Sequence, residues 1–290
     1  MAYRRQRVDE DGALRDATRL HTERFTTAVS QLGNESAAVR LGGVHALAGL
    51  ADDAPTRELR QTCIDVLCAY LRLPYTAEAD LPANDAEARH TYLALREVRH
   101  TIIRLIRDHL RLPLEHHHSW QGHDFDFTEV MFDGGDLSEA VFSGGMVDLS
   151  RAEFSGGTVD FFAAVFSGSR VDFGAAQFSG RVDFRQAVFS GGMVDLSRAE
   201  FSGGTVAFNR ADFSGSRVDF GSAEFSGGTV DFSRAEFSGG TVDFGAARFS
   251  GGTVAFSEAT GTAPHALIPA AGAPLPDGLI LAAAWQPTGP

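Results

Sequence analysis

Chemically reactive side chains are sparse in this chain, and their densest group is a run of three histidines. His116, His117 and His118 are adjacent, and His123 follows five residues later. Imidazole nitrogens bind zinc, copper and nickel, so this run is a candidate metal site. Adjacent side chains on an irregular chain rarely converge, however, so a linker that binds no metal is the favoured interpretation.

The two cysteines also argue against a metal site. Cys63 and Cys68 are five residues apart in a segment that reads as a helix. At 3.6 residues per turn they lie about 140° apart, so one helix cannot present both to a metal or to each other. Buried, reduced thiols are the favoured interpretation, and there is no disulfide framework.

Motifs for catalysis are missing from the sequence. We find no phosphate-binding Gly-x-x-x-x-Gly-Lys-Ser/Thr, no nucleophile elbow, no His-Glu-x-x-His and no serine with a suitable His and Asp set. Gly-Gly-Thr resembles a phosphate cradle, but it recurs at regular intervals, which is typical of a structural corner. The sequence therefore predicts a protein that is not an enzyme and uses no cofactor.

Carboxylates are the one chemical group present in quantity. The net charge is −13, and every basic residue is Arg. Residues 121–260 contain 20 acidic residues and 9 Arg, whereas residues 1–120 contain 17 acidic residues and 16 Arg. Nearly all the net charge therefore belongs to the second half of the chain.

These carboxylates lie within a repeat that runs from about Phe127 to Phe256. It contains 23 large apolar anchors, spaced by 5 residues at first and then alternately by 7 and 5, with one gap of 6. A small or branched apolar residue usually stands two positions before each anchor, and residues n and n+2 share one side of a strand. Five residues are too few for a strand and a hairpin, so the chain must turn a corner after each strand and wind as a parallel solenoid. The anchors predicted to fill its core include Phe154, Phe166, Phe178, Phe189, Phe201, Phe213, Phe225, Phe237 and Phe249.

Units such as Ala152-Glu153-Phe154-Ser155-Gly156 and Val230-Asp231-Phe232-Ser233-Arg234 resemble the pentapeptide-repeat proteins. The resemblance implies a right-handed, four-sided β-helix with its anchors inside. This sequence departs from the family in one respect, because two extra residues enter every second unit after Phe142. The coil should then take about 24 residues instead of 20. Ser-Gly-Gly and Ser-Gly-Ser are expected at the corners, where glycine adopts a positive φ.

We expect an α+β protein with two domains. Residues 1–114 form a small all-α domain, 115–122 a linker, 123–260 the β-helix, and 261–290 a Pro, Ala and Gly-rich tail. In the tail, Leu279 to Leu281 and Trp285 could fold over the last coil and shield an exposed sheet end. The helical domain should cap the open lower end of the rod or hold a partner.

Four helices are predicted in the first domain. The first runs from Arg4 to Leu32, Asn34 caps a second that ends at Leu50, Asp53 with Pro55 starts a third that ends near Leu71, and Asn84 starts a fourth that ends at Leu112. The segment from Val39 to Ala51 is similar to one helix of a HEAT-type repeat.

The aspartates of the repeat are the candidate interaction surface. Each precedes an anchor and should face outward. The aspartates should therefore form two columns, and within each column neighbouring carboxylates should be roughly 4.8 Å apart. One column contains Asp148, Asp172, Asp195, Asp219 and Asp243. The opposite column contains Asp160, Asp183 and Asp231, and it is interrupted by Ala207 and Ala255.

A surface of this kind suits two functions. A rigid, acidic rod can be a scaffold that binds another protein, which is the favoured interpretation. Alternatively, some pentapeptide-repeat proteins resemble duplex DNA and bind DNA gyrase, and acidic columns could imitate DNA here. Ice binding is a remote third reading, based on Thr205, Thr229, Thr241 and Thr253 at one repeat position. The acidic surface could also serve only solubility.

The remaining expectations concern partners and location. No direct nucleic-acid binding is expected from so acidic a chain. The sequence contains neither a transmembrane helix nor a secretory signal, so a cytoplasmic protein is expected. Longer proteins that resemble it often carry membrane helices, and the Arg-rich start from Arg4 to Arg7 is compatible with the inner face of a membrane. Membrane association would then require a segment that this chain does not contain.

Overall fold

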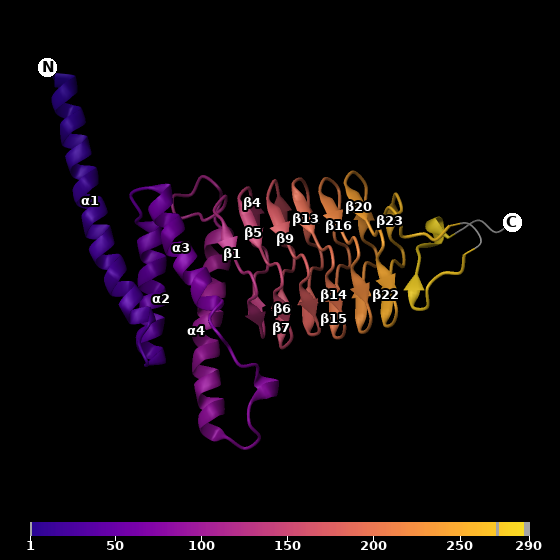
Figure 1. Ribbon diagram of the computed structural model, residues 1–290. Coiled ribbons are helices and arrows are strands. Elements are labelled where there is room, and N and C mark those ends of the chain that lie inside the picture. The colour runs from indigo at the N-terminus through magenta and orange to yellow at the C-terminus, as the bar shows by residue number, and fades with distance from the viewer. Residues whose placement is uncertain (1, 271–272, 287–290) are drawn as a thin grey trace.

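The structure is a computed structural model, and it describes residues 2–270 and 273–286, with the side chains of 2–11 and 13 left out. The charged side chains of Arg4, Arg5 and Arg7 therefore lie outside the described residues. Four helices at the N-terminal end are followed by a rod of stacked, parallel strands (Figure 1). The predicted α+β organisation is confirmed.

The helical part contains α1 (Ala2–Leu32), α2 (Ala37–Asp52), α3 (Arg57–Leu71) and α4 (Ala86–Leu110), with a short 3-10 helix η1 (Glu78–Asp80). Among these described helices none is long and apolar enough to span a membrane. Helix α1 packs on α2, and α2 packs on both α3 and α4.

The predicted starts of α2, α3 and α4 were one to three residues too early, whereas α1 begins two residues before the predicted Arg4. The N-cap residues are Ser36, Thr56 and Asp85. The Thr56 hydroxyl accepts the Leu59 N–H, and the Asp85 carboxylate accepts two N–H groups of the first turn. Asn84 cannot begin the helix because its φ is +67°, which is left-handed backbone.

The rod has four faces, which we call A to D in the order the chain visits them. Face A contains β1 (Phe125–Asp126), β5 (Met146–Asp148), β9 (Arg170–Asp172), β13 (Met193–Asp195), β16 (Arg217–Asp219) and β20 (Thr241–Asp243). Face B contains β2 (Met131–Phe132), β6 (Glu153–Phe154), β10 (Gln177–Phe178), β14 (Glu200–Phe201), β17 (Glu224–Phe225) and β21 (Arg248–Phe249).

The other two faces complete each coil. Face C contains β3 (Gly135–Asp136), β7 (Thr158–Asp160), β11 (Arg181–Asp183), β15 (Thr205–Ala207), β18 (Thr229–Asp231), β22 (Thr253–Ala255) and β24 (Leu279–Ile280). Face D contains β4 (Val141–Ser143), β8 (Val165–Ser167) and β12 (Val188–Phe189), then β19 (Glu236–Phe237) and β23 (Thr260–Gly261). Asp212 bridges the two parts of face D.

The coil length agrees with the repeat. Phe201 pairs with Phe225 and Val206 with Val230, 24 residues further on, and every strand pair among the described residues is parallel. Two extra residues in alternate units therefore enlarge the coil without changing the winding.

Stacked phenylalanine rings fill the rod. Phe178, Phe201 and Phe225 stack with ring centroids 4.8 and 4.7 Å apart, the spacing of neighbouring strands. The predicted anchors are buried except Phe249, which is only partly buried. Phe249 lies on β21, the last strand of face B, so no further coil covers it.

The corners are of two kinds, and only one kind matches the predicted glycines. Gly157 and Gly204 turn the chain from face B to face C with positive φ. From A to B and from C to D, the left-handed residue is instead an Arg, Ala, Glu, Gln or Ser, such as Arg151 at +56°. The N–H of Arg151 donates to the Gly174 carbonyl of the next coil, and this bond helps to hold the strained conformation.

Both ends of the rod are covered. Strand β24 pairs with β22, and Trp285 packs on Phe237 and Phe256 at the last coil. This confirms the expectation for the tail. At the other end, α3 contacts β1 and α4 contacts β3. Residues 115–122, predicted as a linker, are partly packed into this junction, since Trp120 is fully buried against His109.

Candidate interaction surface

The aspartates of faces A and C have a structural role that sequence reasoning missed. The Gly221 N–H donates to Oδ1 of Asp219 over 2.8 Å. The N–H two residues later makes the same bond, at 2.7–3.0 Å, to Asp126, Asp136, Asp148, Asp160, Asp172, Asp183, Asp195, Asp231 and Asp243. Each aspartate therefore fastens the corner that follows its strand, as Asx turns do.

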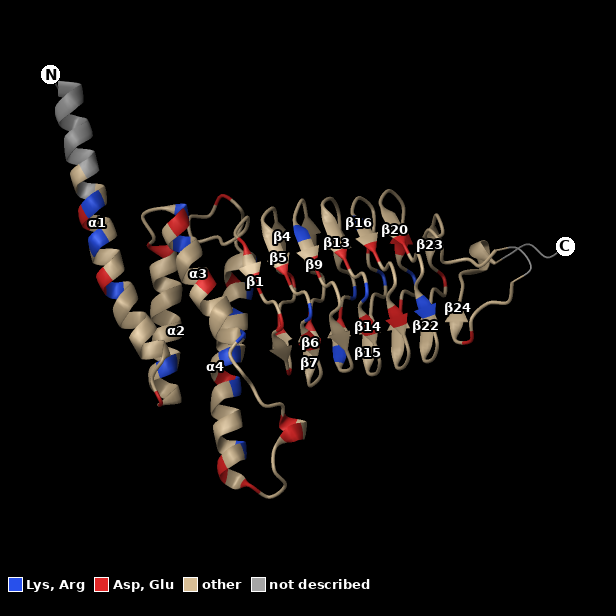
Figure 2. Ribbon diagram, viewed as in Figure 1, with Lys and Arg blue, Asp and Glu red and all other residues tan. Residues whose placement is uncertain are grey.

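The two columns are in register as their spacing predicts. On face A, Asp148, Asp172, Asp195, Asp219 and Asp243 are paired from strand to strand. On face C, Asp160 pairs with Asp183, and Ala207 and Ala255 flank Asp231. The acidic residues recur along successive coils in Figure 2.

Several of these carboxylates are largely covered. The exposed fraction of the side chain is 17% for Asp172, 19% for Asp219 and 5% for Asp183. Arg170, Arg217 and Arg185 each lie within 4 Å of one of them. None of the eight candidate aspartates is exposed. Much of this charge therefore lies in hydrogen bonds that stabilise the rod.

Local chemistry changes the pKa of some of these groups. Burial raises the pKa of Asp160, and the neighbouring charges of Asp183 and Asp136 add to this, although the Phe162 N–H opposes it. At the end of face A, a hydrogen bond with His265 lowers the pKa of Asp243. Repulsion within the column of carboxylates on face C therefore contributes to the raised pKa of Asp160.

The accessible acid of the rod is mainly glutamate. Glu153, Gln177, Glu200 and Glu224 follow one another in register on the outside of face B, and we call them the glutamate stripe. Glu200 and Glu224 are exposed and Glu153 is half-buried. The sequence does hold a signal for this stripe, because each residue precedes a core phenylalanine just as the aspartates do.

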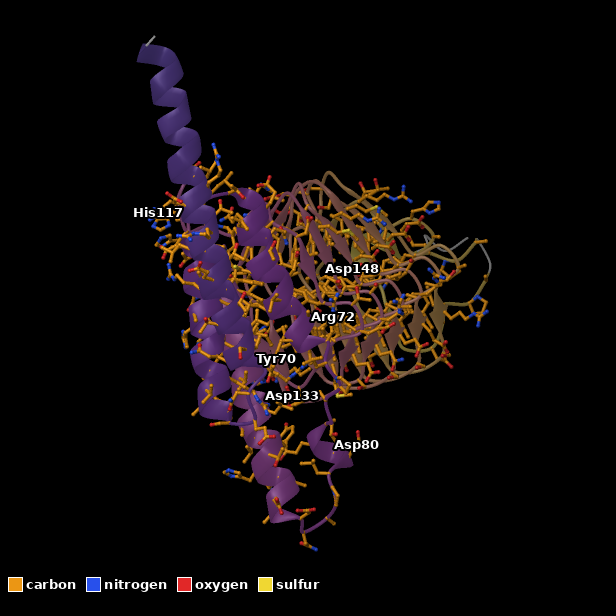
Figure 3. All side chains as sticks on the ribbon, turned by 60° about the vertical axis from the view of Figure 1, so that its left-hand side comes forward. Tyr70, Arg72, Asp80, His117, Asp133 and Asp148 are labelled. Atoms are coloured by element: carbon orange, nitrogen blue, oxygen red, sulfur yellow. The ribbon has the colours of Figure 1, made fainter. Side chains whose placement is uncertain are left out.

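The junction shows how this acidic rod binds a basic surface. Arg72, the C-cap residue of α3, forms an ion pair with Asp126, and Arg107 of α4 forms one with Asp136. These are the first aspartates of the columns on faces A and C. Figure 3 shows Arg72 and Asp133 where the helices meet the first coil. Arginines from two helices thus bind the rod's own acids and cover its open end.

Asp133 is the most heavily bonded carboxylate of the junction. It accepts hydrogen bonds from the hydroxyls of Tyr75 (2.6 Å) and Tyr92 (2.8 Å), lies 3.1 Å from His100 Nε2, and is 3.2 Å from Arg96 Nε. Burial raises the pKa of Asp133, but the bonds from His100 and the two tyrosines outweigh it and hold the pKa below its ordinary value. This carboxylate is therefore charged, and it joins α4 to the rod.

The histidine run follows α4 and lies beside α2 and α3. The rings of His116, His117 and His118 are in contact, with centroids 3.9–5.5 Å apart, although such convergence was not expected. His118 Nδ1 lies 3.9 Å from Asp52, which also binds His109. Across the described residues, no group of three or more His, Cys, Asp or Glu has a geometry that could hold a metal ion.

The cysteines are buried and free. Burial raises the pKa of the Cys63 thiol to about 11 and that of Cys68 further still. A thiol that stays protonated at neutral pH is a poor nucleophile.

The four threonines at one repeat position do not lie in one row. Thr205, Thr229 and Thr253 lie in register on face C, but Thr241 is on face A, beside Arg217. On face C, Arg181 separates Thr158 from Thr205. The shared position in a 12-residue repeat splits over two opposite faces because one coil contains two such repeats.

The fold and the surface define a class of protein: a parallel β-solenoid of about six coils with an N-terminal helical domain and a charged outer surface. Comparisons with protein-family models, with curated proteins and with solved structures found no match.

Proposed function

We propose that this protein is a non-enzymatic scaffold that binds a protein partner on the outside of its rod. The observation that carries the proposal is the filled interior. Stacked rings occupy the axis from Phe132 to Phe256, so the outer faces are what the rod offers to another molecule. We also infer that the rod is of the pentapeptide-repeat type, on the strength of its alternating anchors.

The glutamate stripe is the proposed contact. Two of its acids are exposed, and its side chains repeat at the strand spacing, about 4.8 Å, with the neutral Gln177 between Glu153 and Glu200. The molecule's own junction indicates the chemistry of the partner, since arginines on helices bind acids of the first coil there. A partner with arginines or lysines on one helical face would fit the stripe.

Capture from a lysate followed by a charge test addresses this proposal. A partner that the wild-type protein captures should lose most of its affinity for a Glu153→Gln, Glu200→Gln, Glu224→Gln variant, and its binding should weaken with salt. The matched control removes the same charge elsewhere, through Glu129→Gln, Glu139→Gln and Glu236→Gln. Equal losses in both variants, or no loss in either, would contradict the role of the stripe.

Imitation of DNA is a second candidate function. It is favoured by Glu200 and Glu224, which stand in register one coil apart, with Gln177 before them and Arg248 after them. Each DNA strand carries one charge per about 3.4 Å, so this pair of charges copies only a short piece of a strand. A DNA gyrase supercoiling assay tests this. The protein should inhibit supercoiling at micromolar concentration and the stripe variant should not, whereas no effect of the wild-type protein would refute the idea.

A further inference from the structure

A groove of about 440 Å³ runs along the corner between faces C and D. We call it the corner groove, and its lining includes Arg185, Gln186, Asn209, Arg210, Ser233 and Arg234. It extends from Phe162 to Glu258, which are four coils apart. At about 4.8 Å per coil the groove is roughly 19 Å long, enough for about six residues of extended chain.

The corner groove gathers positive charge on an otherwise acidic rod. Residues 121–260 contain 9 Arg, and three of them line this groove. Arg185 is paired with Asp183 at 2.5 Å and Arg234 with Glu258 at 2.8 Å. Arg210 is exposed, and its guanidinium has no hydrogen-bond or ion-pair partner among the described residues.

Backbone geometry fixes the position of the Arg210 main chain. Its φ is +58°, and its N–H donates to the Ser233 carbonyl of the next coil over 3.1 Å. Neighbouring polar groups are held as well, since Asn209 Nδ2 donates to Asp231 over 2.5 Å. The groove therefore presents a free guanidinium on a rigid corner, flanked by amide and hydroxyl groups.

We propose that the corner groove is a binding site for the carboxylates of a short, extended acidic peptide, with Arg210 as the principal contact. A planar guanidinium binds carboxylates through two parallel hydrogen bonds. The net charge of −11 on residues 121–260 repels long polyanions such as DNA. A short acidic segment of a partner protein carries fewer charges, so the rod repels it less. The site is separate from the glutamate stripe and goes beyond the proposed scaffold function.

The test is fluorescence anisotropy with fluorescein-labelled hexaglutamate at low ionic strength. Arg210→Gln should weaken binding about three- to fivefold, because an ion pair of an exposed arginine contributes up to about 1 kcal/mol and about 1.4 kcal/mol is tenfold. The matched control is Arg198→Gln. Arg198 has the same φ of +58° and is also exposed, but it occupies the opposite corner, between faces A and B. This variant should bind within about twofold of the wild type.

Three results would overturn the proposal. The first is no binding of hexaglutamate by the wild-type protein at 1 mM concentration, which is about the weakest affinity of interest. The second is an equal loss in the Arg210→Gln and Arg198→Gln variants, which would show that binding depends on net charge and not on the corner groove. The third is competition by inorganic phosphate at a lower concentration than glutarate, which would assign the site to phosphate instead.

Discussion

The Asp219 carboxylate has two roles, since it accepts a backbone hydrogen bond and carries a negative charge. Replacement by alanine removes both, whereas replacement by asparagine removes only the charge. Asparagine keeps an oxygen that can accept the Gly221 N–H, whereas alanine leaves that N–H without its partner. Both replacements remove the charge. If the cap is what matters, Asp219→Ala should destabilise the rod and Asp219→Asn should not.

The expected magnitudes follow from the surroundings of Asp219. Loss of a capping bond of this kind costs about 1–2 kcal/mol. The ion pair with Arg217 is 3.4 Å long and the arginine side chain is 61% exposed, so it contributes less than about 1 kcal/mol. Removing the charge also relieves repulsion from Asp195 and Asp243 in the same column. For Asp219→Asn these two effects oppose each other, and the net change should stay within about 0.5 kcal/mol.

Urea denaturation followed by circular dichroism measures the difference. Because a solenoid can unfold in more than one step, midpoints of the transition should be compared as well as free energies. The reciprocal change is Ala255→Asp, which places a carboxylate where the column on face C lacks one and should stabilise by about 0.5–1 kcal/mol. Equal destabilisation by alanine and asparagine at position 219 would refute the capping argument and point to charge instead.

Three further predictions concern the core and the junction. Phe201→Ala should destabilise the rod by about 3–5 kcal/mol in thermal or urea unfolding, because Phe201 is fully buried between two stacked rings; a cost below about 1 kcal/mol would contradict the filled core. Asp133→Ala should cost about 3–5 kcal/mol and speed proteolysis between the helices and the rod, since it leaves several buried donors unpaired; an unchanged cleavage rate would argue against this junction. Burial and nearby Arg57 and Arg60 lower the pKa of His123 to about 4. The unfolded chain then binds a proton that the folded protein does not, so stability should fall by up to about 3 kcal/mol as the pH drops from about 6.5 to 4. His123→Gln should remove most of that slope.

The winding of the rod could be predicted because it depends on local periodicity. Alternation places Ala152 and Phe154 on one side of a strand, and a step of five residues leaves room only for a corner. The same reasoning placed the aspartate columns in register. It failed at Arg151 and similar corners, because non-glycine residues hold a left-handed conformation there with help from the next coil.

The candidate site was harder to predict than the fold. Sequence position shows that Asp172 faces outward, but it does not show that a backbone N–H two residues later holds its carboxylate and that only 17% of its side chain is exposed. The glutamate stripe follows the same rule of position, yet its members do not precede such a corner and remain accessible. Accessibility is a property of neighbouring coils, so it appears only when the coils are stacked.

The amino-acid sequence by itself determined that phenylalanines line the axis of a parallel solenoid with about 24 residues per coil, because side-chain direction along a strand alternates with a period of two residues. The tertiary structure decided which acidic side chains are exposed, which arginines line the corner groove, and how the helices cover the first coil. Those features join residues such as Arg107 and Asp136, or Arg185 and Arg210, that are 25 or more positions apart. Only the stacking of coils and the docking of helices brings such residues together.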